Sequence, residues 1–417
     1  MTTDEKLVIV SVLNISNPQH LDSDSGYITQ ELFGRELLRQ KHQFILIAPI
    51  INQPRVPCYY LKLGNSKYEV RFGFPYSEFR KILGQIWKKY GHIDWIWVNQ
   101  PEILTAIYAV KHELGFNDTR IFTYIHYLPI LEFSEETRHW IWDPSLNGGQ
   151  LALPIMRRIA EGCQLADIIG IHSQFGKNML NKVADGIGMP LRCEKIRVIP
   201  TATDPLFLTD KIQAPPLKKS ILFGYPNRLY AHYGTSEIFT NFEQLCTKWN
   251  AKVWITNPTH NRSQDRKRLD PNSSVLEKNI LTRDFVINFD DVPSRLKYRS
   301  LLVQSHLIFG PNRKAALWSL CLIDGMGMGI PSLAPNYGAF KEMLPAQCLY
   351  LDFPEMDYKI QQLLENEDFW MKNASECFFR AQKYLPFHQV TYLESILWRA
   401  KDHGQCEVSD GRTVIFS

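Results

Sequence analysis

Short apolar segments alternate with amphipathic segments along most of this chain, and this alternation restricts the fold more than any other feature. Residues 6–15 (KLVIVSVLNI) are rich in β-branched side chains and suit a strand that is buried on both faces. Residues 27–40 carry apolar side chains at helical spacing, and residues 42–49 form a second apolar segment. Repeated strand and helix units of this kind build doubly wound parallel sheets. We therefore predict an α/β fold.

The alternation runs twice, and a linker separates the two runs. Residues 209–220 (TDKIQAPPLKKS) combine two adjacent prolines with basic residues, which is typical of a domain linker. We predict two Rossmann-like, doubly wound parallel-sheet domains that face a cleft, where such sheets bind ligands. The predicted divisions are an N-terminal domain over 1–207, a linker over 208–220, a C-terminal domain over 221–385, and a C-terminal helix over 386–417 that crosses back to the N-terminal domain.

Composition and charge exclude several classes of protein. The 417 residues suffice for two or three domains with buried cores, and the formal net charge of +4 is too small to demand a nucleic acid or a membrane as partner. The eight cysteines include no CxxC pair, which argues against a zinc site and for a reducing compartment. The first residues lack the basic start of a signal peptide, and no apolar stretch approaches the roughly 20 residues of a membrane helix. We expect a cytoplasmic protein.

Residues 321–343 (CLIDGMGMGIPSLAPNYGAFKEM) place two acids among glycines. Gly338 precedes a predicted helix start, where backbone N–H groups and the helix dipole attract an anion. The carboxylate of Asp324 is suited to accept hydrogen bonds from two ribose hydroxyls, and Glu342 to bind a sugar or cap its own helix. The alternative is that Gly325, Gly327 and Gly329 only allow a helix to end and to pack closely.

Four stretches, taken in order, resemble the nucleotide-sugar-dependent glycosyltransferases of the two-Rossmann-domain (GT-B) type, in their large retaining group (family 4-like). The stretches together span nearly the whole chain. The resemblance implies a transferase that moves a hexose or pentose from a nucleoside-diphosphate sugar to a hydroxyl, with retention at the anomeric carbon. The four stretches are 25–49 (SGYITQ…LIAP), 166–180 with 196–207 (ADIIGIHSQFGKNML and IRVIPTATDPLF), 225–234 (YPNRLYAHYG) and 317–343 (LWSLCLIDGMGMGIPSLAPNYGAFKEM).

The resemblance assigns roles to single residues of the C-terminal half. Asp324 takes the place of the second Glu of the Glu-x7-Glu motif, which binds the ribose, and Ala316 takes the place of the first Glu. Arg228 matches the arginine that binds the diphosphate, but Tyr233 stands where a lysine is expected. The alanine is a departure that puts the contacts with the donor sugar in doubt.

Further donor-site residues complete the expected site. Arg313 or Lys314 is expected to supply the missing positive charge, because their loop should face the same phosphates. Two cations on a diphosphate suit the departure of a nucleotide, whose negative charge grows. The resemblance places His126 near the donor sugar or the leaving oxygen, as a catalytic candidate with Arg228 and Lys314. The resemblance also implies that the backbone at Gly26 lies close to the phosphates or the sugar of the donor. A structural role for His126 is the alternative.

The expected acceptor site lies in the N-terminal domain. Asn99 and Glu102 follow a predicted strand and should face the cleft. Trp140 and Trp142 are expected in a long loop, as a lid, a stacking platform or simple packing. Residues 79–91 (FRKILGQIWKKYG) interleave basic and aromatic side chains, which suits a membrane surface or a nucleic acid, or else an ordinary solvated helix.

The acceptor itself is the least constrained part of the prediction. Residues 124–129, 164–180 and 225–232 faintly resemble the queuosine tRNA mannosyltransferases, which glycosylate a nucleic-acid base as phage DNA glucosyltransferases do. We therefore weakly favour a modified base in DNA or tRNA as the acceptor. A saccharide or a lipid-linked sugar is the alternative. The sugar, the donor nucleotide and the oligomeric state stay open.

Two other classes of function and the metal requirement complete the predictions. The alanine at position 316 allows a non-catalytic protein that binds a nucleotide sugar or a nucleic acid, and the fold also allows a sugar-nucleotide epimerase. We expect no metal and no cofactor beyond the nucleotide-sugar co-substrate. Asp290 and Asp291 are interpreted as a loop and helix cap rather than as metal ligands.

Overall fold

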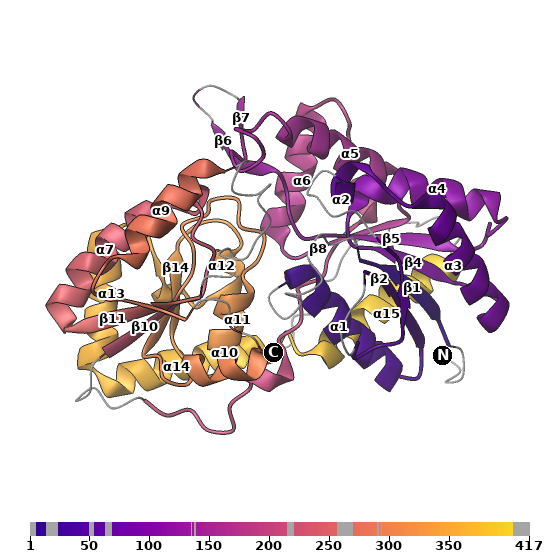
Figure 1. Cartoon of the computed structure of the whole chain (residues 1–417). Coiled ribbons are helices and arrows are strands. Elements are labelled where there is room, and N and C mark those ends of the chain that lie inside the picture. The colour runs from indigo at the N-terminus through magenta and orange to yellow at the C-terminus, as the bar shows by residue number, and fades with distance from the viewer. Residues whose placement is uncertain are drawn as a thin grey trace.

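Two parallel β-sheets, one in each half of the chain, organise the molecule, and Figure 1 shows them side by side. We call the elements around the first sheet the first lobe and those around the second sheet the second lobe. The predicted α/β architecture with two doubly wound parallel sheets is confirmed. The computed structural model describes residues 6–13, 24–49, 54–62, 69–134, 136, 139–214, 221–256, 270–289, 292 and 294–402.

The first lobe holds a seven-stranded sheet in the order β3-β2-β1-β4-β5-β8-β9. Its inner strands are apolar and almost fully buried; β1, for example, reads VIVSV without an exposed residue. The helices lie on both faces because each connects two parallel strands. The strands are β1 (Val8–Val12), β2 (Gln43–Ala48), β3 (Cys58–Tyr60), β4 (Trp95–Val98), β5 (Arg120–Ile125), β8 (Ile168–Ile171) and β9 (Ile196–Val198), and the helices are α1 (Ser25–Arg39), α2 (Glu69–Phe72), α3 (Tyr76–Tyr90), α4 (Leu104–Glu113), α5 (Ala152–Leu165) and α6 (Gln174–Gly186).

The second lobe repeats the plan with a six-stranded sheet in the order β12-β11-β10-β13-β14-β15. All of its pairings are parallel. The strands are β10 (Ile221–Tyr225), β11 (Ala251–Ile255), β12 (Val286–Asn288), β13 (Leu307–Phe309), β14 (Ser332–Pro335) and β15 (Leu349–Tyr350), and the helices are α7 (Thr235–Trp249), α9 (Pro271–Leu281), α10 (Arg295–Leu302), α11 (Leu320–Gly327), α12 (Phe340–Met343), α13 (Phe353–Glu365) and α14 (Glu367–Gln382). The last helix, α15 (Pro386–Asp402), follows in sequence.

Helix α15 is last in sequence but packs in the first lobe, against α1 (Figure 1). Val390, Leu393 and Leu397 are buried in the same apolar cluster as Leu7 and Ile9. The apolar side of an amphipathic helix is thus covered by the sheet and helix of the other end of the chain. The domain boundaries given above stay a prediction.

A two-stranded antiparallel hairpin stands apart from both sheets (Figure 1). It consists of β6 (Ile130–Ser134) and β7 (His139–Trp142). The expectation of a long loop around Trp140 and Trp142 is therefore wrong. The alternation in HWIW is short, and a strand this short is hard to separate from a loop by its pattern alone.

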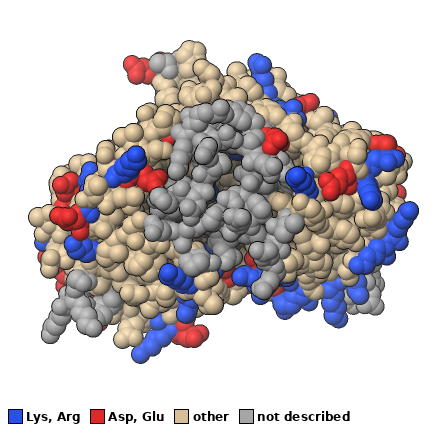
Figure 2. All heavy atoms as spheres, viewed as in Figure 1, with Lys and Arg blue, Asp and Glu red and all other residues tan. Residues whose placement is uncertain are grey.

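The basic and aromatic residues of α3 divide between its two sides. Lys81, Lys88 and Lys89 are exposed, whereas Phe79 is buried and the ring of Trp87 stacks on that of Phe116 at 4.0 Å between centroids. The helix is thus an ordinary amphipathic one, with its aromatic side chains in or against the core. Figure 2 shows both signs of charge spread over this face of the molecule. In the part of the chain that the structure describes, no helix is long and apolar enough to cross a membrane.

Leu393 provides a test of how α15 is held. Replacing this fully buried side chain (Leu393→Ala) leaves a cavity between α15 and the first lobe. We expect the free energy of unfolding to fall by about 2–5 kcal/mol, as measured by urea denaturation. The control is Tyr392→Ala at the preceding position, where the side chain is 44% exposed. There we expect the free energy of unfolding to change by no more than about 0.5 kcal/mol. Equal effects at the two positions would contradict this packing.

Candidate functional site

A cavity of about 380 Å³ lies where the carboxyl ends of the two sheets face each other. In each sheet the order reverses beside the first strand: β1 lies between β2 and β4, and β10 lies between β11 and β13. Ligands bind at such switch points in open α/β sheets. The cavity walls come from segments that follow β4, β5, β8 and β9 in the first lobe, and β10 and β13 in the second.

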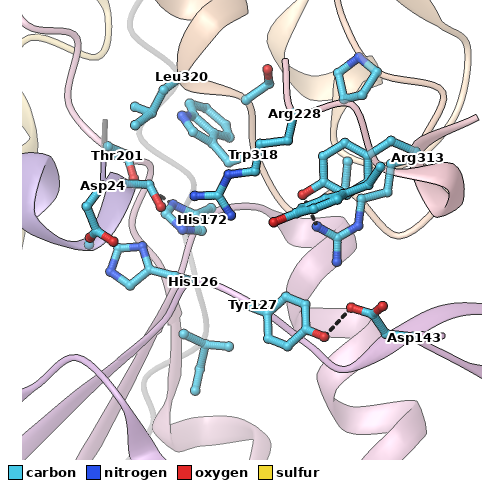
Figure 3. Close-up of a pocket in the computed structure, with 18 of the residues that line it drawn as sticks. Asp24, His126, Tyr127, Asp143, His172, Thr201, Arg228, Arg313, Trp318 and Leu320 are labelled. Atoms are coloured by element: carbon cyan, nitrogen blue, oxygen red, sulfur yellow. Dashed lines mark hydrogen bonds between the residues drawn. The ribbon is translucent and has the colours of Figure 1, made fainter. Parts of the chain in front are cut away.

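His126 and Asn99 form a hydrogen-bonded pair on the first-lobe side (Figure 3 shows His126). Burial lowers the pKa of His126 to about 3, so its ring is neutral at physiological pH. Because Asn99 Oδ1 can only accept, His126 Nε2 carries the hydrogen and Nδ1 keeps its lone pair. Nδ1 is buried and has no hydrogen-bond partner among the described residues. Gly26 also lines the cavity, where a Cβ would collide with the amide nitrogen of Asn99.

Two arginines face the cavity from the second lobe (Figure 3). Arg228 follows β10, and Arg313 follows β13. Burial lowers the pKa of Arg228, but the neighbouring tyrosines, Tyr230 foremost, more than offset this, so the pKa lies above its usual value. Arg313 Nη1 donates to Tyr233 Oη at 3.2 Å, and its guanidinium lies 5.4 Å from the centre of the Tyr127 ring. Both side chains are therefore charged and held in place.

The carboxylate of Asp143, in the first lobe, lines the same cavity as Arg228 and Arg313. Tyr127 Oη donates a hydrogen bond to Asp143, and the backbone N–H of Ser145 donates to the same carboxylate at 2.9 Å. His232 of the second lobe places Nε2 3.7 Å from Asp143 Oδ1. Burial alone would raise the pKa of Asp143, but His232 and Tyr127 hold it below its usual value. Asp143 is thus an ionised group at the junction of the two lobes.

Glu102, the other predicted acceptor residue besides Asn99, also lines the cavity. Its carboxylate forms an ion pair with Arg71, and Arg158 donates two hydrogen bonds to its carbonyl oxygen at 3.0 and 3.1 Å. The Arg71 guanidinium lies 5.3 Å from the centre of the Tyr127 ring. Tyr127 is therefore flanked by one arginine from each lobe.

Asp324 occupies a different place from the expected one. Its side chain is buried on α11, does not line the cavity, and lies 3.3 Å from Arg295 Nη2. Arg295 also pairs with Asp204 at 3.1 Å. Burial raises the pKa of Asp324 to about 7, although Arg295 opposes the shift. The ribose-binding role of Asp324 stays a prediction. To bind a ribose, Asp324 would first have to leave its buried contact with Arg295.

Three further predicted donor-site residues lie outside the cavity wall. Glu342 accepts hydrogen bonds from the backbone N–H groups of Gln174 and Phe175 at 2.8 and 2.7 Å, so it caps the first turn of α6 in the other lobe. Gly338 adopts φ 59°, and a Cβ there would meet the carbonyl oxygen of Lys314 at 2.9 Å. Lys314 Nζ lies 2.5 Å from a carboxylate oxygen of Glu132 on β6.

The predicted aromatic platform and the metal sites complete the comparison with the sequence. Trp140 packs against Phe133 with ring centres 4.8 Å apart, and neither Trp140 nor Trp142 lines the cavity. Among the residues the structure describes, no group of three or more His, Cys, Asp and Glu side chains is placed to hold a metal ion. Asp290 and Asp291 lie outside the described residues.

Asp143, His172 and Thr201 are among the cavity residues of the first lobe that sequence reasoning missed, as are Arg71 and Tyr127. A signal for His172 was present, because it directly follows the apolar run of β8 just as His126 follows β5. Thr201 comes shortly after β9 in the same way. Asp143 had no such signal, since it follows a strand of the hairpin, which was not predicted.

Comparison with known proteins gives a fold and no closer relation. No protein-family model and no curated protein matches the sequence. Among solved structures, sucrose-phosphate synthase from Thermosynechococcus elongatus is similar with a TM-score of 0.70 at 13% identity, over 96% of this chain and 100% of the other. HepE from Anabaena, in complex with UDP and glucose, gives 0.67 at 12% identity over 94% and 100%. OtsA, a trehalose-6-phosphate synthase, gives 0.66 at 12% over 94% and 99%. The chain therefore has the GT-B fold, as the sequence resemblance implied.

The buried pair of Asp324 and Arg295 predicts a dependence of stability on pH. The unfolded carboxyl group ionises near pH 3.8, whereas that of the folded chain keeps its proton up to about pH 7. Between these values the folded state binds more protons, so Asp324 makes stability fall as the pH rises. Asp324→Asn removes this contribution. We expect the variant to gain stability relative to the wild type from pH 4 to 7 in urea denaturation.

The control for this measurement is Asp185→Asn, which replaces an exposed carboxylate on α6. Its difference in unfolding free energy from the wild type should stay nearly constant across the same pH range. A constant difference for Asp324→Asn as well would contradict the raised pKa.

Proposed function

We propose that this chain is a glycosyltransferase that moves a sugar from a nucleoside-diphosphate sugar to a hydroxyl group of an acceptor. The observation that carries the proposal is the pair of arginines, Arg228 and Arg313, at the switch point of the second sheet. They face a first-lobe wall that offers neutral hydrogen-bonding groups such as His126. The second-lobe wall carries these two arginines, and the first-lobe wall combines neutral groups such as His126 with the ionised Asp143 and the ion pair of Arg71 with Glu102. We propose that the arginines face a diphosphate and that the polar groups of the first lobe face a sugar. The shared GT-B fold supports this assignment.

The two arginines are proposed to bind the diphosphate. Charge-assisted hydrogen bonds from guanidinium groups to phosphate oxygens are strong and directional. They also stabilise the negative charge that grows on the departing nucleotide. The first turn of α11 opens onto the cavity through Ser319, Leu320 and Cys321, so its positive end adds to the same field. Lys314 forms an ion pair with Glu132, so it is a weaker candidate than the two arginines for binding the diphosphate.

His126 is proposed to hold the sugar rather than to transfer a proton. With a pKa of about 3 it does not act as an acid near neutral pH. Its Nδ1 lone pair lacks a partner among the described residues. This atom is fully buried, so a sugar hydroxyl would reach it only after a local rearrangement of the cavity wall. Gly26 allows Asn99 to keep its hydrogen bond with His126, because a Cβ at position 26 would collide with the amide nitrogen of Asn99.

For the acceptor we propose a saccharide. The names of two similar structures, sucrose-phosphate synthase and trehalose-6-phosphate synthase, denote enzymes that make saccharides. A modified base in DNA or tRNA, the acceptor we weakly favoured from the sequence, has no support from these comparisons and enters the test below as a competing outcome. Arg71, Glu102 and Asn99 stand on the first-lobe side of the cavity, where the acceptor would enter.

A non-catalytic binding protein is the second candidate function. Ala316 lines the cavity at the place where the resemblance expects a Glu near the donor sugar. Its backbone is held by hydrogen bonds with Arg313 and Ala339. This candidate predicts that a nucleotide sugar binds but is neither transferred nor hydrolysed.

The test begins with a thermal-shift screen of UDP-, GDP-, ADP- and CDP-sugars, because a ligand that binds only the folded state raises its melting temperature. The nucleotide sugar that raises the melting temperature is then incubated with the protein and with saccharides, DNA or tRNA. The release of nucleoside diphosphate is followed in each case. Transfer to a saccharide is the expected result. Binding without release would favour the non-catalytic candidate, and no shift with any donor would contradict both.

Arg228→Ala tests the diphosphate assignment. Loss of a charge-assisted hydrogen bond costs about 1.5–3 kcal/mol, so affinity for the matching nucleoside diphosphate should fall about 10- to 100-fold. Isothermal titration calorimetry measures the change. Arg192→Ala is the matched control, because Arg192 is exposed and does not line the cavity. Unchanged affinity in Arg228→Ala would remove this arginine from the site.

A further inference from the structure

His172 lies in the cavity wall with one side of its ring held by two hydroxyl groups. It directly follows β8 and is 4% exposed. Its Nδ1 atom lies 2.7 Å from Thr201 Oγ1 and 3.0 Å from Tyr124 Oη. Its ring runs nearly parallel to that of Trp318, at 12° and 6.2 Å, and lies edge-on to that of His126 at 5.0 Å. These contacts fix both the position and the orientation of the imidazole.

An account of the hydroxyl hydrogens indicates which ring nitrogen is protonated. Tyr124 donates its hydrogen to the carbonyl oxygen of Ile199 at 2.5 Å. Thr29 donates its hydrogen to the carbonyl oxygen of Ser25 at 2.7 Å. Thr201 therefore has three acceptors within reach, His172 Nδ1 at 2.7 Å, Thr29 Oγ1 at 3.4 Å and Tyr124 Oη at 3.5 Å.

The shortest of these three contacts favours one tautomer. If Nδ1 carried a hydrogen, Thr201 would be left with the contacts at 3.4 and 3.5 Å, which are both outside the usual range for O–H···O bonds. With Nδ1 as acceptor, Thr201 makes a bond of ordinary length and the ring hydrogen lies on Nε2. Burial, and then the neighbouring His126, lower the pKa of His172 well below its usual value, so the ring does not carry a second proton.

The opposite nitrogen, Nε2, is the one without a protein partner. In the described part of the chain no hydrogen bond is formed at this atom, and it is not one of the fully buried polar atoms that lack a partner. It therefore keeps access to the cavity that His172 lines. Figure 3 shows the ring among the labelled side chains of Thr201, His126, Trp318 and Arg228. A fixed N–H donor with no internal partner is suited to an oxygen atom of a ligand.

We propose that His172 is a substrate-binding residue that Thr201 holds as the neutral Nε2–H tautomer, and that this N–H donates a hydrogen bond to an oxygen of the bound nucleotide sugar. The oxygen belongs either to the diphosphate or to the sugar. The proposal rests on the proposed function. With it, His172 offers a hydrogen to the cavity, whereas the Nδ1 lone pair of the neighbouring His126 is fully buried.

The tautomer is tested without any ligand by ¹⁵N NMR of histidine-labelled full-length protein, since bare and protonated ring nitrogens differ in chemical shift. The His172 signals are assigned by their loss in His172→Gln. We expect the hydrogen on Nε2 in the wild type and in Thr201→Ser. Thr201→Val removes the hydroxyl, so the hydrogen should move to Nδ1, where Tyr124 Oη can accept it. Thr29→Val, which leaves Thr201 in place, should keep it on Nε2. A hydrogen on Nδ1 in the wild type would overturn the proposal.

Binding is tested by calorimetry with the nucleotide sugar found in the thermal-shift screen and with its nucleoside diphosphate alone. His172→Phe keeps a flat ring without the N–H, and we expect it to weaken binding of the nucleotide sugar about 3- to 10-fold. His172→Gln supplies an amide N–H and should recover part of the loss. Equal weakening of the diphosphate would place the accepting oxygen there, and weakening of the nucleotide sugar alone would place it on the sugar.

The dependence on pH separates a neutral donor from a cation. The ratio of wild-type to His172→Phe affinity should stay constant from pH 6 to 8.5, whereas a cationic imidazole would lose its effect as the pH rises. Unchanged affinity in a correctly folded His172→Phe would overturn this proposal and leave the proposed function intact. Failure of the wild type to bind any nucleotide sugar would overturn both, and the tautomer measured by NMR would then stand only as a property of the fold.

Discussion

In a parallel sheet every strand ends along the same edge, and this constraint brings the chemistry of the molecule together. His126, His172, Arg228 and Arg313 are far apart in the sequence, yet each follows a strand of a parallel sheet. Because the two sheets turn these edges toward each other, the four side chains line one cavity. The apolar strands are therefore what positions the polar residues, although none of their own side chains takes part in the proposed reaction.

The two lobes meet through charged and polar groups that are buried in pairs. Arg295 is held between Asp204, which follows β9, and Asp324 on α11. Tyr127 and Asp143 of the first lobe contact Arg313 and His232 of the second. A buried charge without a partner would be strongly destabilising, so each of these groups restricts where its partner can lie. Such an interface specifies one relative position of the lobes more closely than apolar packing alone would.

The sequence predicted the fold well and the site unevenly, and the reasons are physical. Strand and helix periods are local properties, so the two runs of alternation were sufficient to predict both sheets. Asn99 and Glu102 follow a predicted strand and were expected at the cleft by the same logic, whereas Arg228 came from the family resemblance; all three line the cavity. The direction of a side chain on a helix depends instead on partners that are distant in sequence. Asp324 lies on Arg295, and Glu342 caps α6, for reasons that their own segments do not contain.

The contact between Glu342 and α6 has a consequence for how the two lobes are held together. Both carboxylate oxygens of Glu342 hold N–H groups in the first turn of a helix from the other lobe, where the helix dipole favours a negative charge. Separating the lobes at this point breaks two charge-assisted hydrogen bonds at once and leaves the positive end of α6 without its counter-charge. Any separation of the lobes at this point is therefore opposed by one carboxylate that lies outside the cavity wall.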